Sequence, residues 1–174
     1  MRRKFLYLSL MVMMLCFTAC NQSLVHQRSV TDLNAKAQQL MQQGDVEGAI
    51  GRLESAMDLM PEELTIQYNL AIAYQENGDF DKAIELLENL LEAKNLKTKG
   101  LTKGSLMRTL AIVYESSGDK LIEDAQTAEE EKKKDLAKDL SEEALGFYDK
   151  SIDAFETYQK SLKQPDPAIE QQLE

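Results

Sequence analysis

The stretch LAIAYQENGDFDKAIELLENLL, residues 70–91, decides the fold. It aligns without a gap with residues 36–57, at a shift of 34 residues. The positions identical in both copies are Ala37/Ala71, Gly44-Asp45/Gly78-Asp79, Ala49-Ile50/Ala83-Ile84 and Leu53-Glu54/Leu87-Glu88. Apolar residues recur three and four apart on either side of each Gly-Asp pair, which predicts two amphipathic helices joined by a turn. A repeat of this length predicts a stack of such helix pairs.

The residues shared by the two copies have separate physical roles. Ala71 and Ala83 are small where the two helices of a pair press together. Gly78 supplies the positive φ that ends the first helix, and the Asp79 carboxylate is expected to cap the second. Pro61 ends the helix before it, because proline has no N–H to donate.

This pattern resembles the tetratricopeptide repeat, which is 34 residues long. The matching residues are Leu33, Ala37, Leu40, Gly44-Asp45-Val46, Ala49, Leu53, Ala56 and Pro61 in the first copy, and Leu70-Ala71-x-x-Tyr74, Gly78-Asp79-Phe80, Ala83, Leu87 and Leu90 in the second. Lys36 stands where the family usually has Leu, which suits an N-terminal repeat with one exposed flank. The resemblance implies an all-α fold, a short right-handed solenoid of antiparallel helix pairs.

A third copy of the repeat is altered. Its Gly118-Asp119 pair lies 40 residues after Gly78-Asp79, six more than the repeat length, so the loop at residues 95–104 is longer than usual. The small residue of the next helix should fall at position 123, where Glu123 stands, and a better match is Ala144. The third pair therefore contains an insertion.

The sequence of the insertion predicts a helix. Residues 120–140 contain no Pro or Gly, and apolar residues continue through them at helical spacing. We therefore expect both helices of the third pair to extend into a longer hairpin that turns within residues 127–135. A single unbroken helix over residues 120–163 is the competing structure. The charged run at residues 129–134 would be a solvated tip, with Glu–Lys pairs four residues apart.

These patterns divide the chain into segments. The predicted order is a cleaved leader at residues 1–19, a tether at 20–30, a repeat domain at 31–163 and a flexible tail at 164–174. The repeats are expected at about residues 30–63, 64–97 and 104–163, with the insertion near 120–140.

The first twenty residues carry a targeting signal. Arg2, Arg3 and Lys4 precede residues 5–19, an apolar run with two polar interruptions. A membrane-spanning helix needs about 20 apolar residues, so this shorter run is typical of a secretory signal peptide. An uncleaved anchor helix over residues 5–19 is the alternative.

The end of the leader, Phe17-Thr18-Ala19-Cys20, resembles the lipobox of bacterial lipoproteins. The resemblance implies diacylglycerol on the Cys20 thiol, cleavage after Ala19 and a lipid anchor in a membrane. Phe17 departs from the Leu that the family usually has. Asn21 replaces the Asp that retains enterobacterial lipoproteins in the inner membrane, so the outer membrane of the cell envelope is favoured. No cysteine follows Cys20, which suits an oxidising compartment.

The resemblance to the tetratricopeptide repeat also implies a binding groove, lined by the first helix of each pair. Carried over by position, its residues are Asn34, Gln38, Met41, Gln42, Thr65, Tyr68, Ile72, Gln75, Ser105, Arg108, Ile112 and Glu115. This lining is nearly neutral and lacks the basic cluster with which co-chaperone repeats hold a C-terminal carboxylate. A peptide or helix of another protein is the expected occupant.

Composition and motifs limit the functional classes. The net charge of −10 argues against nucleic acid as a partner. No motif for catalysis, for a metal or for a cofactor is present, so we expect neither an enzyme nor a cofactor. The sequence predicts a membrane-anchored adaptor or scaffold that assembles a pilus, secretion or cell-wall complex. The alternative is a surface-exposed lipoprotein that binds a peptide or glycan, which an aromatic groove would favour; Tyr68 is the aromatic residue of the predicted lining.

Overall fold

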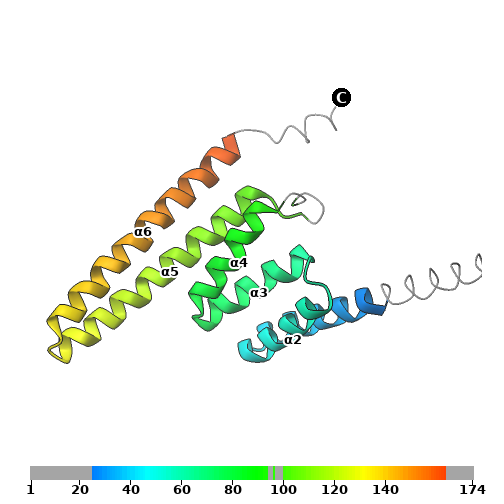
Figure 1. Ribbon diagram of the computed structural model, residues 1–174, viewed down its shortest axis with the longest axis horizontal. Coiled ribbons are helices and arrows are strands. Elements are labelled where there is room, and N and C mark those ends of the chain that lie inside the picture. Colours follow the sequence, from blue (N-terminus) through cyan, green and yellow to red (C-terminus); the bar gives the residue numbers. More distant parts are fainter. Residues whose placement is uncertain (1–24, 94–95, 97–99, 164–174) are drawn as a thin grey trace, which may run out of the picture. The chain divides into compact units, whose positions relative to one another are not determined.

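The computed structural model describes residues 25–93, 96 and 100–163 of the chain (Figure 1). Within that part the secondary structure is helical, as predicted. The helices are residues 25–42, α2 (Val46–Leu59), α3 (Leu64–Asn77), α4 (Phe80–Glu92), α5 (Lys103–Glu130) and α6 (Lys134–Lys163). The chain forms two compact units, Met1–Ile66 and Gln67–Glu174, and the division falls inside α3. The predicted lipidation residue Cys20 and the predicted tail lie outside the described residues.

The first unit contains the first helix pair. The helix over residues 25–42 is followed by a turn at Gly44, whose φ of 79° confirms the predicted turn. The Asp45 carboxylate accepts a hydrogen bond of 2.9 Å from the Gly48 N–H and so caps α2. The α2 helix ends at Leu59, directly before Met60 and Pro61, as the proline predicts. The residues Ala37, Ala49, Leu53 and Ala56 are fully buried and form the core of this pair.

The predicted tether at residues 20–30 is wrong in its second half. Residues 25–30 are helical and continue into the first repeat helix, and Val30 is buried. The polar composition misled the prediction, because no Pro or Gly stops a helix there and the Thr31 hydroxyl donates to the Gln27 carbonyl at 2.9 Å. The described part of the predicted tether, residues 25–30, therefore belongs to the first repeat helix.

The second unit begins with the α3–α4 pair. Gly78 has a φ of 81°, which confirms the turn glycine. The expected cap by Asp79 is wrong: its carboxylate accepts no hydrogen bond from a backbone N–H in the first turn of α4. It instead accepts from the Asn77 Nδ2 at 3.1 Å and lies 3.5 Å from the Lys82 Nζ. The partners of the Asp79 carboxylate are thus the side chains of Asn77 and Lys82 and not the backbone N–H groups of α4.

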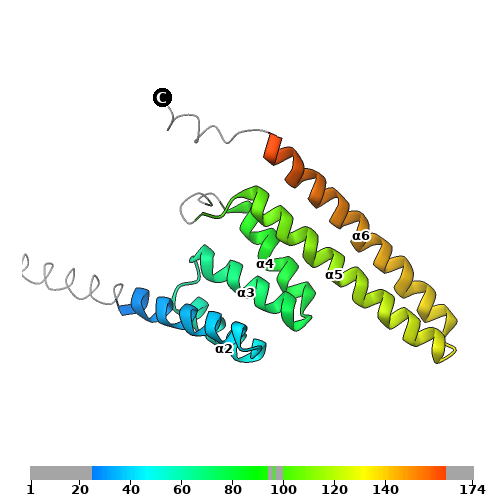
Figure 2. The same cartoon turned by 180° about the vertical axis from the view of Figure 1, so that it is seen from behind.

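The third pair is the extended hairpin (Figures 1 and 2). The α5 and α6 helices lie side by side and reverse at residues 131–133, where Lys132 has a φ of 64°. This turn falls inside the predicted range and excludes the single unbroken helix. The predicted four-residue Glu–Lys pairs of the tip do not form; Lys133 Nζ instead contacts the Glu131 carboxylate at 2.6 Å within the turn.

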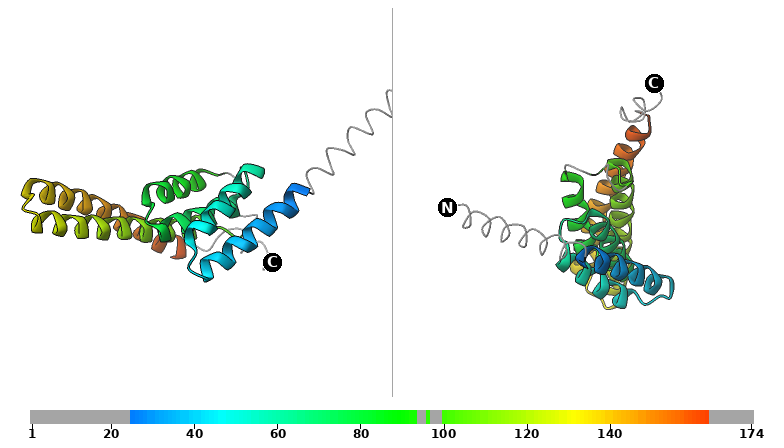
Figure 3. Two further views of the ribbon diagram at one scale, coloured as in Figure 1. Left: turned by 90° about the horizontal axis from the view of Figure 1, so that it is seen from below. Right: turned by 90° about the vertical axis from the view of Figure 1, so that its right-hand side faces the viewer.

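Gly118 does not end its helix as Gly44 and Gly78 do. It lies inside α5 and is buried, at the point where the Tyr148 ring of α6 packs against it. A Cβ added at Gly118 would lie 2.9 Å from the Tyr148 Cε1. The Tyr148 hydroxyl donates to Asp119 at 2.7 Å. The third Gly-Asp pair thus fixes how α5 and α6 pack. In Figure 3 the two helices run side by side up to the turn that joins them.

The α2 helix allows a simple stability prediction. Gly51 lies in its exposed interior, and a Cβ added there meets no atom within 4 Å. We expect Gly51→Ala to raise the free energy of unfolding by about 0.5–1 kcal/mol, because alanine loses less backbone entropy in a helix. Urea denaturation followed by circular dichroism measures this difference. A loss of stability would contradict the open surroundings that the structure gives Gly51.

Candidate protein-interaction site

The predicted groove residues are divided between the two units. Asn34, Gln38, Met41, Gln42 and Thr65 belong to the first unit, and Tyr68, Ile72, Gln75, Ser105, Arg108, Ile112 and Glu115 to the second. Within the second unit α3 and α5 are joined by a contact of 3.0 Å between the Tyr68 hydroxyl and the Thr109 Oγ1. The hydroxyl of Tyr68, the aromatic residue of the predicted groove, is therefore already hydrogen-bonded within the protein. Tyr68 and Ile112 are half-buried, and Arg108 is exposed.

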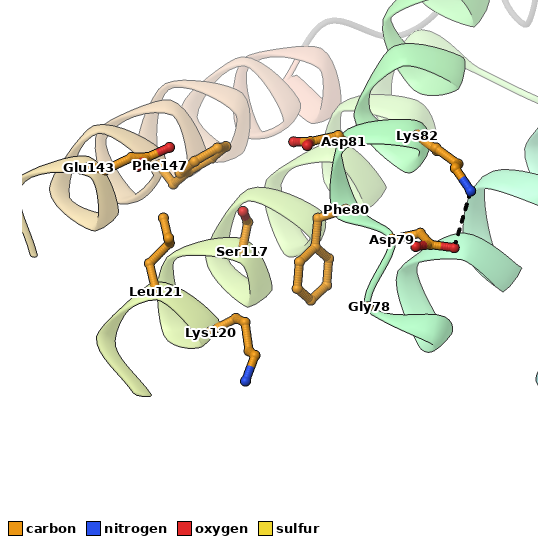
Figure 4. A pocket seen from close by; sticks show the side chains of 10 residues that line it. All are labelled: Gly78, Asp79, Phe80, Asp81, Lys82, Ser117, Lys120, Leu121, Glu143 and Phe147. Atoms are coloured by element: carbon orange, nitrogen blue, oxygen red, sulfur yellow. Dashed lines mark ion pairs between the residues drawn. The ribbon is translucent and has the colours of Figure 1, made fainter. Parts of the chain in front are cut away.

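A second surface of the same unit holds a pocket of about 340 Å³ (Figure 4). One side is formed by the α3–α4 turn and the start of α4, and the other by the part of the α5–α6 hairpin around Gly118. Its lining residues are Gly78, Asp79, Phe80, Asp81, Lys82, Ser117, Lys120, Leu121, Glu143 and Phe147. None of them is a predicted groove residue. Two of them, Lys120 and Leu121, lie at the start of the insertion predicted near residues 120–140.

Side chains from three helices hold the pocket walls together. The Tyr114 hydroxyl of α5 donates to the Glu88 Oε1 of α4 at 2.8 Å. The Tyr114 and Phe147 rings lie 6.2 Å apart, and the Lys150 Nζ of α6 lies 5.6 Å and 5.0 Å from their centres. Burial raises the pKa of Tyr114 above its ordinary value, and the hydrogen bond to the Glu88 carboxylate raises it further. This cluster fixes α4 and α6 to opposite sides of α5.

The raised pKa of Tyr114 predicts a loss of stability in alkali. A tyrosine in the unfolded chain ionises with a pKa of about 10, before the folded one does, so stability falls as pH rises above about 10. At pH 8 we expect Tyr114→Phe to lower the free energy of unfolding by about 0.5–1.5 kcal/mol, because the hydrogen bond to Glu88 is lost. Between pH 9 and 11 the variant should lose less stability than the wild type. Urea titrations across this range check this, with Tyr158→Phe as the control; parallel losses in Tyr114→Phe and wild type would contradict it.

Two further observations bear on the chemistry of the described residues. Residues 25–93, 96 and 100–163 contain no group of three or more His, Cys, Asp or Glu side chains that could hold a metal ion. Every helix in the same part of the chain is too short or too polar to span a bilayer.

Comparison with known proteins bears on the repeat. The family model for the tetratricopeptide repeat matches residues 40–96. This part of the chain is therefore similar to tetratricopeptide repeats. The matched segment runs from the end of the first repeat helix through α4. Tetratricopeptide repeats are in general non-catalytic modules that bind other proteins.

One solved structure is similar to part of this chain. The crystal structure of MamA is 22% identical in sequence, with a TM-score of 0.43, over 75% of this chain and 81% of that chain. No curated protein matches the sequence.

Proposed function

We propose that this chain is a lipid-anchored adaptor that binds other proteins in the bacterial cell envelope. The observation that carries the proposal is the union of two features in one short chain: the Phe17-Thr18-Ala19-Cys20 sequence after an apolar leader, and the tetratricopeptide repeats of residues 40–96. Diacylglycerol on Cys20 would supply two acyl chains and acylation of the new amino terminus a third, and stable anchoring takes at least two. The repeat domain would then present its binding surfaces close to the membrane.

The adaptor would assemble a larger envelope complex, such as a pilus, a secretion system or a cell-wall machine. Its partners are proteins or peptides, because the net charge of −10 repels nucleic acid. Asn21 next to the lipidated Cys20 supports the outer membrane as its location. Residue 25, which is already helical, follows Cys20 closely in the sequence, so a lipid on Cys20 would keep the first repeat helix near the lipid surface.

Co-purification from detergent-solubilised membranes tests this function. The tagged full-length chain is expected to bring down a partner protein in a fixed ratio that survives high-salt washing. The Gly78→Val variant is a matched control, because a β-branched residue is strained at a φ of 81° and should disturb the repeat while leaving Cys20 intact. Recovery of the free lipoprotein alone, in the wild type, would rule out the adaptor role.

A further inference from the structure

The pocket beyond the α3–α4 turn offers an apolar floor. Phe80 of α4, Leu121 of α5 and Phe147 of α6 line it, and each is half-buried and within reach of an inserted side chain. Between them lies Ser117, whose residue is 6% exposed. Among the described residues the Ser117 hydroxyl has no hydrogen-bond partner, and it faces the pocket (Figure 4). No fully buried side-chain oxygen of the described residues lacks a partner, so this hydroxyl is open to the pocket, where it can bind a polar group of a ligand.

The charges around the pocket are unbalanced. Each of its two lysines forms ion pairs with carboxylates. The Lys82 Nζ lies 3.5 Å from the Asp79 carboxylate and 4.9 Å from the centre of the Tyr74 ring. The Lys120 Nζ lies 3.1 Å from both the Glu123 and the Asp124 carboxylates. Two carboxylates of the lining remain.

These remaining carboxylates are Asp81 of α4 and Glu143 of α6. Neither has an ion pair or hydrogen bond within the described part of the chain. Both lie on one side of the pocket in Figure 4, with Lys120 on the other. The pocket therefore combines an apolar floor with two solvent-exposed carboxylates that have no ion pair among the described residues and with the Ser117 hydroxyl.

We propose that this pocket binds an arginine side chain of a partner protein, flanked in the partner sequence by apolar residues. The arginine stem would lie on Leu121, its guanidinium would stack on the Phe80 or Phe147 ring, and its N–H groups would bond to Asp81 and Glu143. Arginine suits this site better than lysine, because its planar group stacks on rings and donates to several acceptors at once. The proposal rests on the adaptor function and adds to it where the partner is bound and by which chemistry.

A direct binding experiment tests the site. The full-length chain in detergent micelles is labelled with 4-fluorophenylalanine at its phenylalanines. It is then titrated with the peptide acetyl-Leu-Arg-Leu-amide, or with the same peptide containing citrulline in place of arginine. We expect the arginine peptide to shift the ¹⁹F signals of Phe80 and Phe147 and leave that of Phe155, which lies on α6 outside the pocket. The citrulline peptide should shift them at least about tenfold more weakly, because it lacks the charge.

Variants separate the site from the adaptor function. Asp81→Asn with Glu143→Gln should remove the arginine-dependent shift, whereas Asp149→Asn, on the same helix outside the pocket, should keep it. In cells, Asp81→Lys with Glu143→Lys should lower partner recovery by about tenfold or more, and Asp149→Lys should not. Equal shifts with arginine and citrulline, or no shift at Phe80 and Phe147, would overturn the arginine site. If the wild type still recovers its partner then, the adaptor function stands without it.

Discussion

The Cys20→Ala variant is expected to lose lipid completely. Cells that express the wild-type chain and are fed a radioactive fatty acid should incorporate label into it, because the Cys20 thiol is the acceptor implied by the lipobox. The variant has no thiol at that position, so label should be absent. Processing should change as well: the wild type should shorten by residues 1–19, whereas the variant should keep the leader. Autoradiography of the purified chain and its intact mass measure both effects.

The chain supplies its own control for this experiment. Cys16 is the other cysteine, and it follows Leu15, which is not small. Cys16→Ala should therefore be labelled and shortened like the wild type. Label that persists in Cys20→Ala, or label lost from Cys16→Ala, would contradict the assignment of the anchor to Cys20.

The second large effect concerns the packing of the extended hairpin. We expect Gly118→Leu to destabilise the folded chain, because the added Cβ alone would lie 2.9 Å from the Tyr148 Cε1. Overpacking of this kind costs about 1–3 kcal/mol, and the displaced ring would also lose its hydroxyl bond to Asp119. Leucine recovers part of this, roughly 1 kcal/mol, through its better helix propensity. Urea denaturation should therefore show a net loss of about 1–3 kcal/mol.

The same substitution at Gly146 is the matched control. Gly146 lies in α6, and a Cβ there meets no atom within 4 Å. Gly146→Leu should leave stability unchanged or raise it by up to about 1 kcal/mol, since only helix propensity changes. If the two leucine variants were equally stable, the close approach of α5 and α6 at Gly118 would be refuted.

Local chemistry explains which parts of the fold could be predicted. The chain turns at Gly44 and at Gly78. Each of these glycines is followed by an aspartate and then by a helix that begins with an apolar residue, Val46 or Phe80. The same pair at Gly118-Asp119 is followed by Lys120 and more apolar residues at helical spacing, so the helix continues. The sequence shows that continuation, and the extended hairpin was predicted from it. The turn itself, at Lys132, lacks a glycine and could be predicted only within a range.

The candidate site was harder to predict, because it depends on packing between segments far apart in the sequence. Leu121 and Glu143 looked like ordinary members of amphipathic helices. Their role appears only once the hairpin lies beside the turn at Gly78. Likewise, the polar residues before Val30 gave no sign that residues 25–30 belong to the first helix, since charge and polarity do not stop a helix. The groove residues predicted by resemblance remain a prediction.

Native mass spectrometry of the wild-type chain, extracted from membranes in mild detergent, tests the central claim most directly. The adaptor proposal predicts one species that contains the chain from Cys20 onward, its covalent lipid and a partner protein in a fixed ratio. A chain that still begins at Met1 without lipid would contradict the anchor. A lipidated chain that is always alone would contradict the adaptor.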